Sequence, residues 1–161
     1  MIFVQYMVLE FSLTIPSSAK KIKEKITDFK NFKNYMPLQI EEVRIIEDED
    51  EFMGISLDNN QVITEEIITS KAILKARIKQ RSLQTINDNS LITKIIQGPA
   101  EGTIIKLVLD QQDGQTLVSI SIEPKLKMKY FFLKPLIGKE YKKIFTAILY
   151  RIHTEIVNEN E

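Results

Sequence analysis

The last third of the chain first alternates between apolar and polar residues and then changes to a helical repeat. From Thr116 to Met128, most apolar residues occupy one set of alternate positions and polar residues the other. This period of two predicts a strand with one buried and one solvated face. The segment that follows predicts one long amphipathic helix, because its apolar residues recur at three- and four-residue steps: Ile137, Tyr141, Ile144, Phe145, Ile148, Leu149, Ile152 and Ile156. A sheet packed against a long C-terminal helix is therefore expected.

The first forty residues predict a strand followed by two short helices. Residues Leu9 to Ile15 alternate, and Pro16 ends that strand. A signal peptide is the alternative for the apolar start, but the segment lacks a positively charged region and a small-residue cleavage site. Ser17 or Ser18 is a suitable N-cap for a helix with apolar residues at helical spacing. A second helical turn is expected from Asn31 to Met36.

The middle of the chain predicts strands separated by turn residues. The expected strands are Gln39 to Glu47, Glu51 to Leu57, Gln61 to Thr69, Ala72 to Gln84, Leu91 to Gln97 and Thr103 to Gln111, followed by Thr116 to Met128. Asp113-Gly114, between two alternating segments, is the strongest hairpin signal. Repeats, linkers and low-complexity segments are absent from the sequence, so a single domain over residues 1–161 is expected.

Composition narrows the class of protein. Lysine plus arginine and aspartate plus glutamate both total 22, so the sequence provides no net charge that would attract nucleic acid. The chain has no cysteine, which excludes disulfides and thiol chemistry and agrees with a cytoplasmic location. No apolar segment approaches the length of a membrane span.

Two short motifs resemble those of one superfamily. Ile15-Pro16-Ser17-Ser18-Ala19, followed by Ile26-Thr27-Asp28-Phe29-Lys30-Asn31-Phe32 and Tyr35-Met36-Pro37, is similar to its opening segment. Ile96-Gln97-Gly98-Pro99 is similar to its Gly-Pro loop. The order of predicted elements also resembles the helix-grip fold, which is shared by START lipid-transfer domains, birch pollen allergen-like proteins, polyketide cyclases and coenzyme-Q-binding proteins.

The resemblance implies an α+β fold in which a curved antiparallel sheet, with two short helices after its first strand, wraps around a long C-terminal helix. It also implies binding or carriage of a hydrophobic small molecule, lipid-like or quinone-like, in a cavity between the sheet and that helix. Residues with mostly apolar side chains are the candidate lining: Phe32, Tyr35, Leu74, Ala76, Ile78, Gln80, Ile96, Leu107, Ile120, Tyr141, Phe145 and Leu149.

One predicted strand carries basic residues on a single face: Lys71, Lys75, Arg77, Lys79 and Arg81. A patch that binds anionic lipid or nucleic acid is one interpretation. The favoured interpretation is a solvated convex face whose charges pair with Glu65, Glu66 or Asp110. The segment lacks the aromatic residues that would stack on bases, so no nucleic-acid partner is expected. Transient contact with a membrane surface and the oligomeric state are left open.

Candidates for catalysis or metal binding are few. The acidic run from Glu47 to Glu51 lacks the glycine and spacing of a calcium loop and is expected to be an exposed turn. His153, the only histidine, has no companion ligands for zinc, and a position on a helix face is favoured. No catalytic residue, metal or cofactor is therefore assigned.

Three classes of function stay open. Gln80 and Ser82, with Thr93, are expected to face inward, and Glu42 and Glu66 are the best acid–base candidates, although the facing of their strands is ambiguous. Ligand binding without catalysis is favoured. A cyclase- or dehydratase-type enzyme would need an ionisable group facing the same cavity, and a ligand-free interaction domain would show a filled core and an exposed apolar patch.

Overall fold

The computed structural model describes residues 8–70, 74–125 and 134–160, apart from the side chains of residues 70, 74–76 and 134–139. The described elements, in chain order, are β1 (Leu9–Ile15), α1 (Ala19–Ile26), the 3₁₀ helix η1 (Phe29–Asn34), β2 (Ile40–Ile46), the 3₁₀ helix η2 (Glu49–Glu51), β3 (Gln61–Ser70), β4 (Leu74–Ile86), β5 (Ser90–Gln97), β6 (Ile104–Gln112), β7 (Gln115–Glu123) and α2 (Lys134–Glu159).

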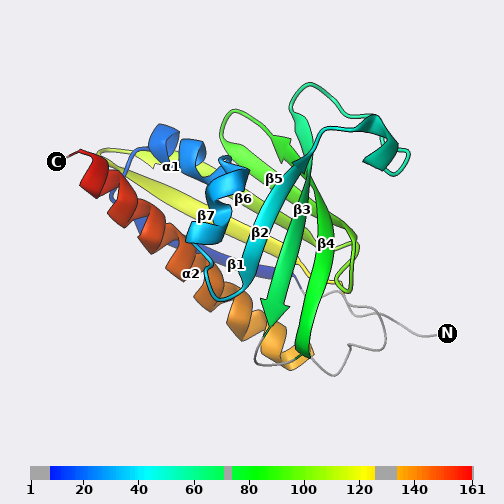
Figure 1. Cartoon of the computed structure of the whole chain (residues 1–161). Helices are drawn as coiled ribbons and strands as arrows, with labels where there is room; N and C mark the ends of the chain where they lie inside the picture. The colour runs from blue at the N-terminus through cyan, green and yellow to red at the C-terminus, as the bar shows by residue number, and fades with distance from the viewer. Residues whose placement is uncertain (1–7, 71–73, 126–133, 161) are drawn as a thin grey trace.

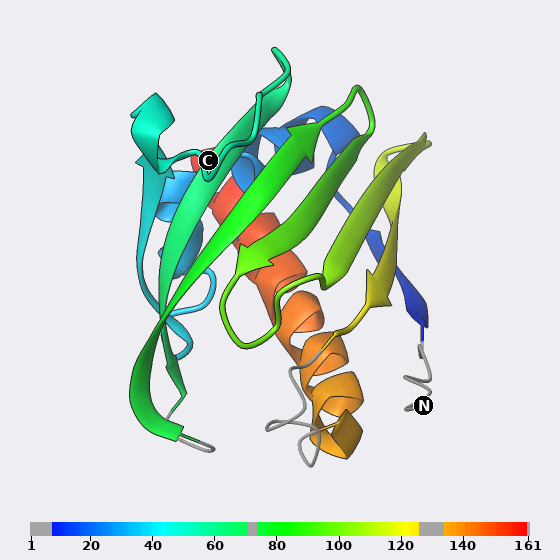
Figure 2. The same cartoon turned by 90° about the vertical axis from the view of Figure 1, so that its right-hand side faces the viewer.

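The strands form one antiparallel sheet of seven strands in the order β1-β7-β6-β5-β4-β3-β2. The sheet curves, and α2 runs diagonally across its inner face (Figures 1 and 2). The helices α1 and η1 lie at one end of the sheet, between β1 and β2 in sequence, as the pattern predicts. Within the described part of the chain, no helix is long and apolar enough to cross a membrane.

The hairpin between β6 and β7 forms where the sequence predicts it. Gln112 pairs with Gln115, so Asp113 and Gly114 make a two-residue loop. Gly114 has a φ of +68°, a conformation that glycine adopts without steric cost. The register that follows places Leu109, Leu107 and Ile105 opposite Val118, Ile120 and Ile122, all on the inner face.

The core lies between the inner face of the sheet and the C-terminal half of α2. Val118, Ile120 and Ile122 of β7 and Leu149 and Ile152 of α2 are almost completely buried in one continuous cluster. These residues come from the two periodic segments of the sequence, the alternating strand and the helical stripe. Burial of this apolar surface is the main force that holds the helix on the sheet.

The chain after β1 enters α1 through a capped end. Ser18 has extended backbone angles, and its hydroxyl accepts a hydrogen bond from the backbone N–H of Lys21. Ile22 and Ile26 are the buried residues of α1, while Lys23 and Lys25 lie in its last turn, where the helix dipole favours positive charge. The second helical turn is the 3₁₀ helix η1, which begins two residues earlier than predicted.

The prediction of a strand from Glu51 to Leu57 is wrong. This segment belongs to an excursion between β2 and β3 that contains η2 and then turns and irregular backbone. Asp48 caps η2 by accepting a hydrogen bond from the backbone N–H of Asp50, because acidic residues are favoured at helix N-termini and not in strands. The alternation in β7 also ends earlier, at Glu123, and Met128 lies outside the described residues.

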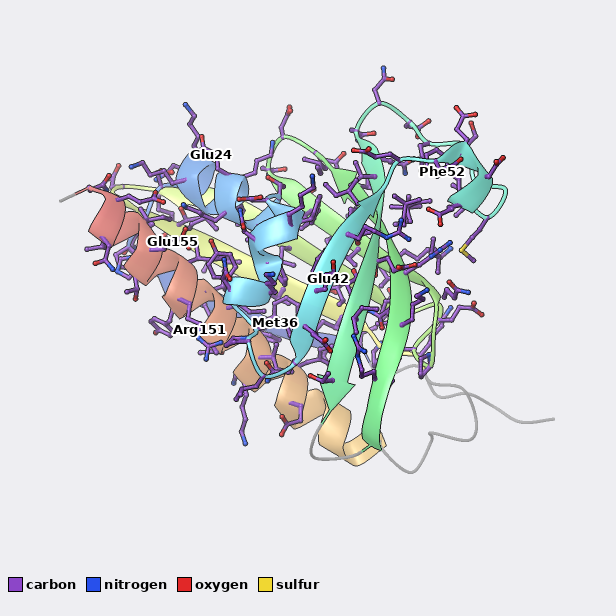
Figure 3. All side chains as sticks on the ribbon, viewed as in Figure 1. Glu24, Met36, Glu42, Phe52, Arg151 and Glu155 are labelled. Atoms are coloured by element: carbon purple, nitrogen blue, oxygen red, sulfur yellow. The ribbon has the colours of Figure 1, made fainter. Side chains whose placement is uncertain are left out.

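The excursion folds back over the outer face of β3 and β4. Ile46 and Ile63 pair across β2 and β3 on that outer face and are buried, apart from the main core. Arg81 of β4 donates a hydrogen bond to the carbonyl oxygen of Glu51, at 3.1 Å, which ties the excursion to the sheet. Figure 3 shows Phe52 on the excursion, beyond the strands. The outer face is therefore not uniformly solvated.

Candidate functional site

A cluster of buried polar side chains lies on the inner face of β3, β4 and β5. The strand register aligns Thr64 with Ser82 and Gln84 with Thr93, and Glu66 with Gln80, all on that face. Thr64, Glu66, Ser82 and Gln84 are each more than nine-tenths buried. The inner face of the sheet is otherwise mostly apolar, so this cluster is a polar island within it.

The hydrogen bonds of the cluster converge on Glu66. Thr64 donates its hydroxyl to Glu66 Oε1 at 2.9 Å, and Ser82 donates to Glu66 Oε2 at 3.4 Å. Gln84 donates its amide to Thr64 Oγ1 at 3.1 Å and accepts from the hydroxyl of Thr93. The chain from Thr93 through Gln84 and Thr64 therefore points its donors toward the carboxylate, and each bond polarises the next.

Glu66 is a buried acid without a cationic partner in the described part of the chain. Its exposed fraction is 8%. Burial raises its pKa from the ordinary 4.5 to about 7, and the hydrogen bonds from Thr64 and Ser82 oppose that rise without cancelling it. An acid with a pKa near neutrality can accept or release a proton under ordinary conditions, which is one property of acid–base catalysts.

The neighbouring Glu65 has the opposite environment. It points to the outer face, where Arg81 donates to it at 2.8 Å and Arg44 at 3.1 Å. Burial alone would raise the pKa of Glu65, but the hydrogen bonds from the two arginines and the charges of Arg44 and Lys79 together outweigh burial and lower it. The predicted pairing of the basic strand with acidic residues is thus present for Glu65. Glu66 does not take part, because it lies on the other face of the sheet.

Tyr141 of α2 is a second candidate polar group. It lies in the first half of α2, is partly buried and packs against the core together with Ile144. Burial raises its pKa to about 12, so its hydroxyl stays protonated. The described residues provide no hydrogen bond to this hydroxyl, and it keeps its capacity to donate and accept one.

Tyr35, by contrast, is engaged in the structure that holds η1 on α2. Its hydroxyl donates to Glu155 Oε2 at 2.6 Å, and Lys25 of α1 donates to the other oxygen of Glu155 at 2.9 Å. Arg151 donates to the backbone carbonyl of Tyr35. Burial and the bond to Glu155 raise the pKa of Tyr35. Figure 3 shows Arg151 and Glu155 on the side of α2 nearest η1. Tyr35 therefore fastens two elements together.

The predicted lining residues divide into groups. Leu107, Ile120, Phe145 and Leu149 belong to the packed core, and Ile120 and Leu149 expose 1% and 0% of their surface. Phe32 packs edge-on against Tyr35, with ring centroids 6.1 Å apart. Ile78 and Gln80 occupy inner-face positions next to the polar cluster, and Ile96 lies at a β-bulge between β4 and β5. The side chains of Leu74 and Ala76 lie outside the described residues.

Sequence reasoning found part of the polar cluster. It placed Ser82, Gln80 and Thr93 on the inner face and named Glu66 as a candidate, but it left out Thr64 and Gln84. The alternation of β4 could have added Gln84, which is two residues beyond Ser82. Glu42, the other acid–base candidate, is exposed and lies on β2 (Figure 3).

The remaining candidates are His153 and the acidic run from Glu47 to Glu51, and both make contacts that hold parts of the structure together. His153 lies on α2, and its Nδ1 is 2.7 Å from the hydroxyl oxygen of Ser17, which joins the helix to the turn before α1. The acidic run is mostly exposed, and Glu51 pairs with Arg44. Among the described residues, no group of acidic or histidine side chains is arranged to hold a metal ion.

No protein-family model matches the sequence, and a search of curated proteins also finds no match. Solved structures do match. A protein from Thermus thermophilus aligns with a TM-score of 0.74 at 11% identity, covering 96% of this chain and 100% of that one. An aromatase/cyclase from a Streptomyces species aligns with a TM-score of 0.73 at 10% identity, covering 98% of this chain and 97% of that one.

A START superfamily protein from Mycobacterium smegmatis aligns with a TM-score of 0.70 at 15% identity, covering 93% of this chain and 99% of that one. Structural alignments of this extent establish the fold, but sequence identities this low leave the activity open. The chain has the helix-grip fold, and its curved antiparallel sheet around a C-terminal helix is the architecture that the sequence predicts.

Proposed function

We propose that the protein binds a hydrophobic small molecule between the inner face of the sheet and the first half of α2. The observation that carries the proposal is the contrast along α2. Its second half packs against the sheet with almost no exposed apolar surface on the packed side, whereas Tyr141 and Ile144 in its first half are only partly buried. Inward-facing Phe11 of β1 and Ile105 of β6 are also partly buried, so apolar surface is available for a ligand.

The helix-grip fold supports this proposal, because its known members include ligand-binding proteins and cyclases, as the START and aromatase/cyclase structures illustrate. A ligand site of this kind is expected to be mostly apolar with a few polar groups that fix orientation. The cluster around Glu66 and the hydroxyl of Tyr141 are suitable polar groups. The predicted lipid-like or quinone-like ligand, the cytoplasmic location and the absence of a nucleic-acid partner stay predictions.

Titration with a neutral apolar fluorophore, N-phenyl-1-naphthylamine, tests the proposal. We expect saturable binding at one site per chain. Ile144→Trp should weaken this binding at least tenfold by occupying the space beside Ile144. Val157→Trp is the matched control, because Val157 is 41% exposed on the same helix. Absence of saturable binding, or equal affinity of both variants and the parent protein, would contradict the proposal. Circular dichroism melts establish that both variants are folded.

Acid–base catalysis on the bound ligand is the second candidate, and the buried Glu66 carboxyl is the observation that favours it. Catalysis by a general acid or base requires an ionisable group in contact with substrate whose pKa is near the working pH, and the pKa of Glu66 is about 7. Screening enolisable polyketide-like ketones for turnover would test it. Activity that survives Glu66→Gln would exclude Glu66 as the catalyst.

A further inference from the structure

We propose that the cluster around Glu66 binds the protonated amine of an otherwise apolar ligand. This inference rests on the proposed function, because it assigns a chemical class to the ligand of the same inner-face site. Three observations carry it: the distribution of charge between the two faces of the sheet, the direction of the hydrogen bonds at Glu66, and its burial without a counter-charge.

The first observation is that charge is segregated between the faces. Strand register and alternation place the basic strand residues whose side chains are described on the outer face: Arg44, Arg77, Lys79, Arg81, Lys94 and Lys106. Acidic Glu10, Glu42, Glu65, Asp110 and Glu123 also occupy outer-face positions. Glu41, at the irregular pair of β2, is exposed and bonds to Arg77 of the outer face. Glu66 is the acidic residue at an inner-face position of these strands. A cation that reaches it must come from the ligand side or from undescribed residues.

The second observation is that the hydrogen bonds suit a carboxylate. Both oxygens of Glu66 receive hydroxyl donors, from Thr64 and from Ser82. The Thr64 oxygen already accepts from the amide of Gln84, so the hydroxyl proton of Thr64 is directed to Glu66. These hydrogen bonds favour the carboxylate over the neutral acid, because a protonated carboxyl oxygen is itself a donor and a weaker acceptor. The cluster therefore presents a preoriented negative group.

The third observation is that the buried carboxylate of Glu66 has no positively charged partner among the described residues. A buried carboxylate is costly unless it is paired and hydrogen-bonded, and here only the hydrogen bonds are present in the described residues. An ammonium group supplies the missing charge and up to three donors for the remaining lone pairs of Glu66. A neutral polar group would leave the charge uncompensated, and an anion would be repelled.

The test compares three probes with the same apolar body and different charge: 2-(1-naphthyl)ethylamine, 2-(1-naphthyl)ethanol and 1-naphthylacetic acid. Isothermal titration at pH 7.5 is expected to give the amine an affinity at least about tenfold above that of the alcohol, the range of close charge pairs. The acid should bind most weakly. Equal affinities for amine and alcohol, or a preference for the alcohol, would overturn the proposal.

The variant Glu66→Gln keeps the shape of the side chain and removes its charge. We expect it to lose the preference, so that the amine and the alcohol bind with similar affinities. Glu42→Gln is the matched control, an exposed glutamate on the neighbouring strand, and should retain the preference. A preference that persists in Glu66→Gln would overturn the assignment. Failure of every probe to bind would instead contradict the proposed function, so the two failures are distinguishable.

Discussion

Glu65 and Glu66 are adjacent in the sequence and nearly equally buried, with exposed fractions of 6% and 8%, but their surroundings are opposite. Glu65 faces outward, accepts from Arg44 and Arg81, and has a lowered pKa. Glu66 faces inward among hydroxyl groups, and burial raises its pKa to about 7. Alternation along β3 separates the two residues by one step and places them on different faces of the sheet.

The comparison shows that burial alone does not decide the role of a charged residue. The partners of Glu65 lie within the protein, so its charge contributes to structure by joining β2, β3 and β4. Glu66 has donors for its oxygens but no described cation. An incomplete site of this kind on an inner face is where a ligand can supply the missing interaction.

The largest effect is expected for Glu65→Gln. Removing the charge of Glu65 leaves Arg81, whose side chain is 15% exposed, with only the more distant carboxylate of Glu51, at 3.8 Å, as a counter-charge. Urea unfolding at pH 7 should show a loss of about 3 kcal/mol in the free energy of unfolding. The loss caused by the substitution should become smaller in acid. Because the folded-state pKa of Glu65 is lowered, its charge stabilises the parent protein at pH values above 4.5, and this stabilisation is lost as the pH falls through the folded-state pKa.

Glu41→Gln is the control for this experiment. Glu41 pairs with Arg77 at 2.9 Å, and both side chains are exposed, so the loss should be below about 1 kcal/mol. Equal penalties for the two variants would mean that Glu65 is no more important to stability than a surface ion pair.

Removing the charge of Glu66 should increase stability, the opposite of the result expected for Glu65. Because the folded-state pKa of Glu66 is raised from 4.5 to about 7, the folded protein retains a proton that the unfolded chain releases over that range. The free energy of unfolding should therefore fall as pH rises from 4.5 to 7. Glu66→Gln should remove this decline and be more stable than the parent protein above pH 7. The gain should be somewhat less than the roughly 3 kcal/mol that the full shift represents, because an amide accepts weaker hydrogen bonds from Thr64 and Ser82 than a carboxylate does. Destabilisation at pH 8 would contradict the account of an uncompensated charge.

Tyr35 and Tyr141, which lie against α2 and on it, allow the same comparison between a side chain with partners in the protein and one without described partners. Tyr35→Phe should cost about 1.5 kcal/mol in thermal or urea unfolding, because it removes a hydrogen bond to the carboxylate of Glu155. Tyr141→Phe should leave stability within about 0.5 kcal/mol, since no described partner is lost. If Tyr141→Phe were the more costly substitution, its hydroxyl would have a structural role.

A small loss of stability is also expected for Ser82→Ala. Its hydrogen bond to Glu66 is long, at 3.4 Å, and its loss should change the free energy of unfolding by less than about 1 kcal/mol. The pKa of Glu66 should rise further, because Ser82 is one of the groups that oppose the effect of burial. A fall in that pKa would show that Ser82 does not stabilise the carboxylate.

Sequence periodicity predicted most of the fold, because amphipathic elements carry their facing in the spacing of residues. β1, β4, β7 and α2 each show that spacing, and the Asp113-Gly114 turn fixed one hairpin. The prediction of a strand at residues 51–57 was wrong because apolar Phe52 and Ile55, between acidic residues, resemble the pattern of a short strand. In the structure, η2 includes Glu51, and Met53 and Gly54 then have φ angles of +57° and +77°, which are incompatible with an extended strand.

The candidate site was harder to predict, because it depends on register between strands. Glu65-Glu66 offers two carboxylates in a row, and the sequence alone does not say which one faces inward. The pairing of Glu66 with Gln80 and of Thr64 with Ser82 decides it. The engagement of Tyr35 with Glu155, 120 residues away in the chain, likewise has no local signal.

The most direct test of the account is the titration of the two carboxyl groups by NMR, with carbon-13 label at the glutamate side-chain carboxyls. Glu65→Gln and Glu66→Gln assign the two signals. We predict that Glu66 titrates near pH 7 and Glu65 below 4.5, and that saturating 2-(1-naphthyl)ethylamine lowers the pKa of Glu66 while leaving that of Glu65 unchanged. Titration of both groups near 4.5, without response to the amine, would contradict it.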